Sequence, residues 1–220
     1  MARRLAGAAG FFKIGSQLFS AEGPRAVEKI AKLGSSIFLD LKFHDIPNTV
    51  AGAVRAAVGL PKVRLLTIHA LGGLEMMTAA KEAAATAKRH SPAILAVTIL
   101  TSHDAGTLQE VGISGTPATR ALELAKLAKE AGVDGVVASA HEVAAIRKAC
   151  GPKFLIVVPG VRPANAAIND QSRIATPAEA IRAGADYLVV GRPITAAGDP
   201  RQAALAISKE IAQASAKERA

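Results

Sequence analysis

Two acidic side chains flank one lysine in the most informative segment of the sequence, Asp40-Leu41-Lys42-Phe43-His44-Asp45, which directly follows an apolar run. If that run is a strand, side-chain alternation points Asp40 and Lys42 to the same side. Nearby carboxylates keep a lysine protonated, so Lys42 is predicted to act as a general acid rather than as a base. The alternative interpretation is a salt bridge that only stabilises the end of the strand.

A second lysine, Lys13, lies inside another apolar run, Phe11–Gly15. Taken alone, such a lysine could extend along the strand edge to solvent. If the two runs are neighbouring strands, however, Lys13 joins Asp40 and Lys42 in an array of alternating charge.

Glycine and arginine occur together after two later apolar runs, in Pro159-Gly160-Val161-Arg162 and in Gly191-Arg192. Backbone N–H groups at glycine and a forked guanidinium are the donors that bind phosphate. The long segment between Arg162 and Thr176 contains Gln171 and is predicted to be a lid. The sequence therefore predicts a phosphate site built from these loops.

Several other catalytic and nucleotide-binding motifs are not formed in this sequence. Ser102-His103-Asp104 are adjacent, so they cannot form a catalytic triad among themselves. His141-Glu142 lacks the second histidine of a zinc-protease helix, and neither a GxGxxG nor a GxxxxGK[ST] segment occurs.

Seven short apolar runs are predicted to be the strands that position these residues. They are Phe11–Gly15, Ile37–Lys42, Leu65–Ala70, Ile94–Leu100, Gly135–Ser139, Phe154–Pro159 and Tyr187–Gly191. Continuous apolar runs are typical of parallel strands covered on both faces, and helical spacing fills the segments between them, such as Thr119–Ala131 and Ala140–Ala149. Because the dinucleotide motif is missing, the repeated βα pattern favours a (β/α)8 barrel over a doubly wound sheet. No linker or composition shift interrupts residues 1–220, which predicts one domain.

Composition excludes several classes of protein. Half of the 220 residues are hydrophobic, which excludes a disordered chain, and no apolar run is long enough to span a membrane. The net charge is +9, but aromatic residues make up only 3%, so a polyanionic small substrate is favoured over nucleic acid. The single cysteine, Cys150, excludes an intrachain disulfide and is typical of the reducing cytoplasm.

The chain resembles the bacterial orotidine 5'-phosphate decarboxylases over about residues 11 to 205. The residues that carry the resemblance are Asp40–Thr49, the Lys13 run, His69–Gly73, Thr98–Ser102, Pro159–Pro163, Gln171 and Gly191-Arg192. The resemblance implies a (β/α)8 TIM barrel that needs no cofactor or metal and converts orotidine 5'-phosphate to UMP and CO2. It also implies a homodimer with shared active sites.

The resemblance further implies a role for each residue of the site. Lys42 would donate the proton to C6 of the pyrimidine, Asp40 would face the departing carboxylate, and Lys13 would complete the array. Asp45 and Thr49 would reach into the partner's site. Thr101 and Ser102 would lie at the pyrimidine edge, and Pro159 would contact the substrate. The phosphate would be surrounded by Arg162, Gln171, Gly191 and Arg192.

Two rival functions stay open from sequence. One is a metal-dependent sugar-phosphate decarboxylase or synthase with the same Asp-x-Lys-x-x-Asp spacing, and the other is a nucleotide binder without turnover. Only seven strands are predicted where such a barrel needs eight, and Met1–Leu5 resembles the end of a helix. The expectation is that a first strand lies upstream of Met1; the alternative is that residues 1–10 or dimerisation close the gap.

Overall fold

Seven parallel strands, each separated from the next by helices, make up the fold in a computed structural model that describes residues 1–87, 91–163 and 175–217. The strands follow in the order β1-β2-β3-β4-β5-β6-β7 within one sheet. This is the strand sequence of a (β/α) barrel, so the predicted fold class and the predicted number of strands are confirmed. The backbone divides into two compact units, residues 1–97 with 127–135, and residues 98–126 with the chain from 136 onward.

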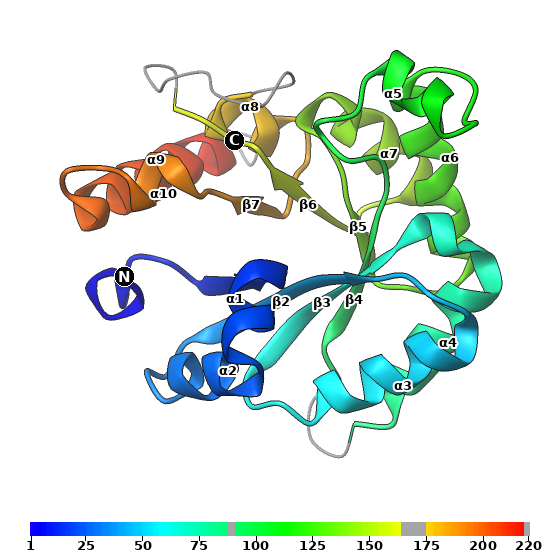
Figure 1. Cartoon of the computed structure of the whole chain (residues 1–220). Coiled ribbons are helices and arrows are strands. Elements are labelled where there is room, and N and C mark those ends of the chain that lie inside the picture. Colours follow the sequence, from blue (N-terminus) through cyan, green and yellow to red (C-terminus); the bar gives the residue numbers. More distant parts are fainter. Residues whose placement is uncertain (88–90, 164–174, 218–220) are drawn as a thin grey trace. The chain divides into compact units, whose positions relative to one another are not determined.

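The first unit contains the strands β1 (Phe11–Gly15), β2 (Ser36–Phe43), β3 (Val63–His69) and β4 (Ala93–Val97). Its helices are η1 (Ala2–Leu5), α1 (Ser16–Glu22), α2 (Pro24–Ala31), α3 (Pro47–Val58), η2 (Ala70–Gly72) and α4 (Gly73–Ala85). The four strands pair in parallel, and α3 and α4 lie side by side against them (Figure 1). Leu39, Leu66, Ile94 and Met76 are completely buried in the core of this unit.

The second unit contains most of β5 (Gly135–Val137), with β6 (Leu155–Pro159) and β7 (Tyr187–Val189). Its helices are α5 (Ala105–Glu110), η3 (Ala140–Glu142), α7 (Val143–Cys150), α8 (Pro177–Arg182), α9 (Arg192–Thr195) and α10 (Pro200–Lys217), and α6 (Pro117–Glu130) runs from this unit into the first. Strands β6 and β7 pair in parallel, and α10 packs against α8 and α9 (Figure 1).

Some predicted ends differ from the observed ones. The strand predicted over Gly135–Ser139 ends at Val137, since the N–H of Ser139 instead donates to Glu142 Oε2 at 2.7 Å and so starts η3. The strand predicted over Ile94–Leu100 likewise ends at Val97. At both places the residues that follow the strand, such as Ile99 and Ala138, are still buried.

The start of α8 follows its sequence signature. Thr176 Oγ1 accepts the N–H of Glu179 at 3.2 Å, and Glu179 Oε2 accepts the N–H of Thr176 at 2.8 Å. Pro177 occupies the first helical position, where its missing N–H costs nothing. These two reciprocal hydrogen bonds form a capping box.

A repeated Ala-Gly-x-Asp segment ties the amino ends of two strands to the preceding helices. In the first unit, Asp134 Oδ2 accepts the N–H of Ile94 at 2.7 Å, and its Oδ1 pairs with Lys81 Nζ at 2.6 Å. In the second unit, Asp186 Oδ2 accepts the N–H of Ile156 at 2.7 Å and pairs with Arg147 Nη2 at 2.6 Å.

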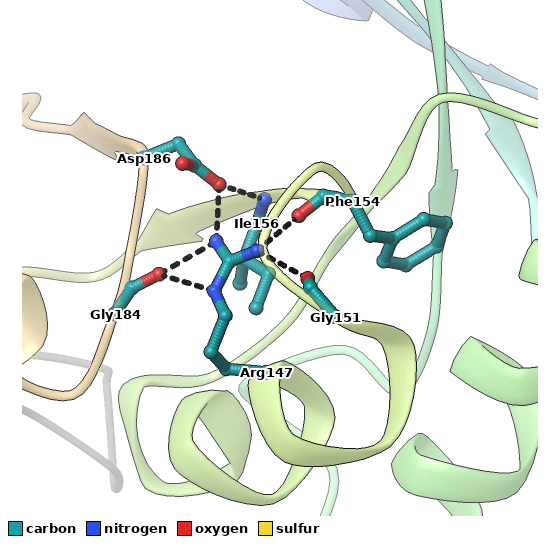
Figure 2. A network of polar contacts seen from close by, with 6 residues as sticks. All are labelled: Arg147, Gly151, Phe154, Ile156, Gly184 and Asp186. Carbon is teal, nitrogen blue, oxygen red and sulfur yellow. Dashed lines mark hydrogen bonds and ion pairs between the residues drawn. The ribbon is translucent and has the colours of Figure 1, made fainter.

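Arg147 makes the larger of these two networks, shown in Figure 2. Its guanidinium donates to the carbonyl oxygens of Gly151 at 2.8 Å, Phe154 at 2.7 Å and Gly184 at 2.8 Å, as well as to Asp186. Gly184 has a φ of 103°, and a Cβ there would approach the Arg147 side chain to 3.2 Å. One arginine thus joins the end of α7 to the turns that precede β6 and β7.

Candidate active site

Three of the predicted charged residues meet at the carboxyl ends of β1 and β2. Lys42 Nζ lies 2.8 Å from Asp40 Oδ1, and Lys13 Nζ lies 3.3 Å from Asp40 Oδ2. The Asp40 side chain is only 12% exposed, whereas those of Lys13 and Lys42 are 36% and 34% exposed. A nearly buried carboxylate therefore lies between two ammonium groups that still reach solvent.

The strand that carries Asp40 and Lys42 is irregular where the two residues occur. Leu39 pairs with Leu66 and Phe43 pairs with Ile68, so residues 40 to 42 of β2 stand opposite the single residue Thr67 of β3. Lys42 adopts a φ of 52°, a left-handed conformation that is rare for a residue with a side chain. Lys42 does lie beside Asp40 as predicted, but through a bulge rather than through regular alternation.

A buried hydroxyl bridges this bulge. Thr67 is completely buried, its Oγ1 donates to Asp40 Oδ1 at 3.0 Å, and it accepts the backbone N–H of Lys42 at 2.9 Å. Sequence reasoning missed Thr67. The available signal was that the alternating series Val63, Leu65, Thr67, His69 changes from apolar to polar at Thr67.

The electrostatics of Asp40 result from opposing effects. Burial by itself would raise the pKa of Asp40. The hydrogen bond from Lys42 and the charge of Lys42, followed by the charge of Lys13 and the hydrogen bond from Thr67, outweigh burial and hold the pKa below its ordinary value. The carboxylate is therefore ionised at neutral pH, and its charge balances one of the two ammonium groups.

An open hollow of about 300 Å³ adjoins the charged residues. Its lining consists of Lys13, Gly15, Ser16, Gln17, Leu18, Asp40 and Lys42. All of these residues belong to the first unit, and they come from β1, the start of α1, and β2. A small anionic molecule in this hollow would contact both lysines.

Asp45 and Thr49 lie outside this group. Asp45 is exposed on the loop after β2, and its Oδ1 accepts the N–H of Ile46 at 2.6 Å. Among the described residues it forms no ion pair, and Thr49 is exposed in the first turn of α3. Both side chains are thus accessible from outside their own chain.

The remaining predicted residues belong to the second unit. Thr101 and Ser102 form a turn after β4, Pro159 ends β6, and Gly191 and Arg192 lie at the start of α9. Gln171 lies outside the described residues, together with most of the segment predicted to be a lid. How these positions lie relative to Lys13, Asp40 and Lys42 stays a prediction.

Arg162 is buried, whereas arginine is usually found at the protein surface. It is only 6% exposed, its backbone N–H donates to the carbonyl oxygen of Ala175 at 3.0 Å, and its buried Nε has no hydrogen-bond partner within the described structure. A buried guanidinium with an unsatisfied N–H is suited to an anionic ligand.

The described residues contain neither a side-chain cluster suited to a metal ion nor a helix suited to crossing a bilayer. Across residues 1–87, 91–163 and 175–217, no three or more histidine, cysteine, aspartate or glutamate side chains gather in a way that could hold a metal ion. Within the same ranges, none of the helices is both long and apolar enough to cross a bilayer.

Comparison with known proteins places the chain among decarboxylases. The model of the orotidine 5'-phosphate decarboxylase / HUMPS family matches residues 1–207. The orotidine 5'-phosphate decarboxylase of Trichlorobacter lovleyi is 56% identical over 212 residues, covering 96% of this chain and 88% of the relative. That of Halorhodospira halophila is 57% identical over 202 residues, covering 92% and 85%. The crystal structure of the Lactobacillus acidophilus orotidine 5'-phosphate decarboxylase superposes with a TM-score of 0.81 at 41% identity, covering 90% of this chain and 85% of that one.

Proposed function

The chain belongs to the orotidine 5'-phosphate decarboxylase / HUMPS family, and we propose that it converts orotidine 5'-phosphate to UMP and CO2 with Lys42 as the proton donor. It is a carboxy-lyase of pyrimidine biosynthesis, like the relatives to which it is similar. The observation that carries the proposed roles is the Lys13–Asp40–Lys42 array, in which one ionised carboxylate lies between two cations.

The reaction places specific demands on that array. When the bond between C6 and the carboxylate breaks, CO2 leaves and the electron pair remains on C6. The Lys42 ammonium, 2.8 Å from Asp40, stabilises the developing charge and then transfers a proton to C6, giving UMP and a neutral amine that solvent reprotonates. Asp40 pairs with the Lys42 ammonium before the reaction and faces the substrate carboxylate, so that departure of CO2 relieves repulsion.

The phosphate, remote from the reacting bond, supplies the binding energy. We assign its contacts to Arg162, Gln171, Gly191 and Arg192. We assign the pyrimidine edge to Thr101 and Ser102, and a further substrate contact to Pro159. The unsatisfied Nε of the buried Arg162 supports its assignment to the phosphate. Binding energy from the phosphate would offset the cost of bringing a substrate carboxylate next to Asp40.

The active enzyme is proposed to be a homodimer with composite sites. Asp45 and Thr49 are exposed and do not join the array of their own chain, which is the condition they must meet to serve a partner. In this arrangement Asp45 of one subunit would complete the charge series of the other, and Thr49 would contact the ribose.

The proposed reaction uses no cofactor and no metal, because two ammonium groups already supply the positive charge that a metal would provide elsewhere. The substrate is a small nucleotide, and neither nucleic acid nor a membrane is proposed as a partner. Pyrimidine synthesis and a single buried thiol, Cys150, both fit a cytoplasmic enzyme.

A direct assay tests this function. Purified protein is mixed with orotidine 5'-phosphate in the presence of EDTA, and loss of the orotate chromophore and release of CO2 are followed together. Stoichiometric formation of UMP and CO2 is expected. Turnover that stops with EDTA and returns with Mg²⁺ would indicate the metal-dependent synthase chemistry instead. Tight UMP binding without any CO2 would indicate a nucleotide binder.

A further inference from the structure

Thr67 occupies a buried position, where a hydroxyl is destabilising unless it is hydrogen-bonded. Its side chain is completely buried in β3, between the apolar residues Leu66 and Ile68, which are also completely buried. The hydroxyl has one hydrogen, which it gives to Asp40 Oδ1 at 3.0 Å, and it accepts the N–H of Lys42 at 2.9 Å. The hydroxyl therefore uses both its donor and an acceptor lone pair at the strand bulge.

The direction of these bonds is fixed by chemistry. An ionised carboxylate can only accept and a backbone N–H can only donate, so the hydroxyl must accept from Lys42 and donate to Asp40. Lys42 is consequently held at both ends: its Nζ bonds directly to Asp40 Oδ1, and its backbone N–H reaches the same oxygen through Thr67.

The backbone of Lys42 needs such support. A φ of 52° is an uncommon and unfavourable conformation for a residue with a side chain, and it persists only when surrounding contacts impose it. Lys42 lies where the pairing of β2 with β3 is irregular, and its backbone N–H donates to Thr67 Oγ1. If the Thr67 hydroxyl were removed, the backbone N–H of Lys42 would lose this hydrogen bond.

We propose that Thr67 is a positioning residue for decarboxylation: its hydroxyl fixes the bulge that aims Lys42 and orients the Asp40 carboxylate beside it. This inference rests on the proposed function for its kinetic consequence. Thr67 need not touch the substrate, because it acts through Lys42 and Asp40, so its loss should affect the chemical step more than binding.

Two substitutions separate the hydroxyl from the shape. Thr67→Val keeps the branched side chain and removes both hydrogen bonds, whereas Thr67→Ser keeps the hydroxyl and removes only a methyl group. We expect kcat of Thr67→Val to fall about 10- to 100-fold with KM changed less than about 3-fold, since misplacement of a reacting group affects mainly the transition state. Thr67→Ser should retain kcat to within about 3-fold.

A titration provides a readout that does not depend on turnover. The charged groups that face Asp40 are Lys13 from β1 and Lys42 from β2, and Thr67→Val leaves both in place. Loss of a donor to the carboxylate should raise the pKa of Asp40, observed by ¹³C NMR of labelled aspartate carboxyl groups, with Asp40→Asn to assign the signal. Thr67→Ser should leave the pKa of Asp40 the same as in the unmodified protein.

Thr98→Val is the matched control. Thr98 is also completely buried, and its hydroxyl donates to the carbonyl oxygen of Val137 at 3.0 Å, so the variant loses a buried hydrogen bond without touching Asp40. It should lower thermal stability but leave the Asp40 titration unmoved. If Thr67→Val behaves in the same way, with normal kcat and an unmoved Asp40 titration, Thr67 is only structural and the proposal fails. Absence of turnover in the unmodified protein would overturn the proposed function, while the titration would still decide whether Thr67 orients Asp40.

Discussion

Gly15 of β1 lies directly opposite Asp40 of β2 in the parallel register, and its missing side chain leaves the space into which Lys13 extends. A Cβ at Gly15 would lie 3.0 Å from Lys13 Nζ. Lys13 itself is in register with Phe38, so its ammonium must pass over Gly15 to reach the Asp40 carboxylate at 3.3 Å. The glycine is thus part of the means by which the two charges meet.

Gly15→Ala should therefore weaken the enzyme through Lys13. The backbone at Gly15 has φ −97° and ψ 180°, which alanine adopts without strain, so stability should change by less than about 1 kcal/mol. Displacement of the ammonium from Asp40 should lower kcat/KM by about 10-fold or more. Gly10→Ala is the control, because a Cβ there meets nothing within 4 Å. Equal steady-state kinetics for the two variants would remove the packing role assigned to Gly15.

Lys42→Ala tests the proton donor. We expect decarboxylation to fall by at least about 1,000-fold, because both the cation next to C6 and the proton source are lost. UMP binding, measured by calorimetry, should change much less, since it depends mainly on the phosphate contacts. Lys29→Ala, at an exposed lysine of α2, should have normal activity. Near-normal kcat in Lys42→Ala would show that another group protonates C6.

Mixing two inactive variants tests the composite site. Asp45→Ala and Lys42→Ala chains are each expected to be inactive as homodimers. After subunit exchange at equal concentrations, half of the dimers should be mixed, and one of their two sites should hold both intact residues, giving about a quarter of normal activity. Mass spectrometry of the intact dimers would verify the exchange. No recovery among verified mixed dimers would place Asp45 in its own chain's site or outside the site altogether.

Asp40 should make stability depend on pH in the acid range. Its folded-state pKa lies below the ordinary value of about 3.9, so the unfolded chain binds the proton more readily. The stabilisation is therefore fully present above about pH 5 and is lost as pH falls below about 4 towards the folded-state pKa. Urea unfolding should show Asp40→Asn to be less stable than the unmodified protein at pH 7, with the difference shrinking at pH 3. A difference that stays constant between those pH values would contradict this account.

Arg147→Met should destabilise the second unit without altering the chemistry. The substitution keeps much of the apolar stem but leaves Asp186 and the carbonyl oxygens of Gly151, Phe154 and Gly184 without their donor (Figure 2). The arginine side chain is 21% exposed, so a loss of about 2 to 4 kcal/mol is expected on urea unfolding. Lys29→Met breaks an exposed ion pair with Glu22 and should have no measurable effect. Equal midpoints for the two variants would mean that the Arg147 network contributes nothing net.

The sequence alone determined the order of the strands and the identity of the central charges. Continuous apolar runs marked all seven strands, because a strand that is covered on both faces has mainly apolar side chains. Asp40, Lys42 and Lys13 were visible because they interrupt these runs, and burying an ionised side chain is costly unless it is paired. The capping box at Thr176 was equally local, because its two hydrogen bonds join residues only three apart.

Only the tertiary structure decided how those charges are held. The bulge that sets three residues of β2 against Thr67 depends on the pairing of two strands, which side-chain alternation along one strand cannot predict. The same is true of Gly15, which becomes informative only once register places it opposite Asp40. Contacts between residues about 25 positions apart depend on the packing of the whole sheet, so Thr67 and Gly15 emerged from the fold rather than from any motif.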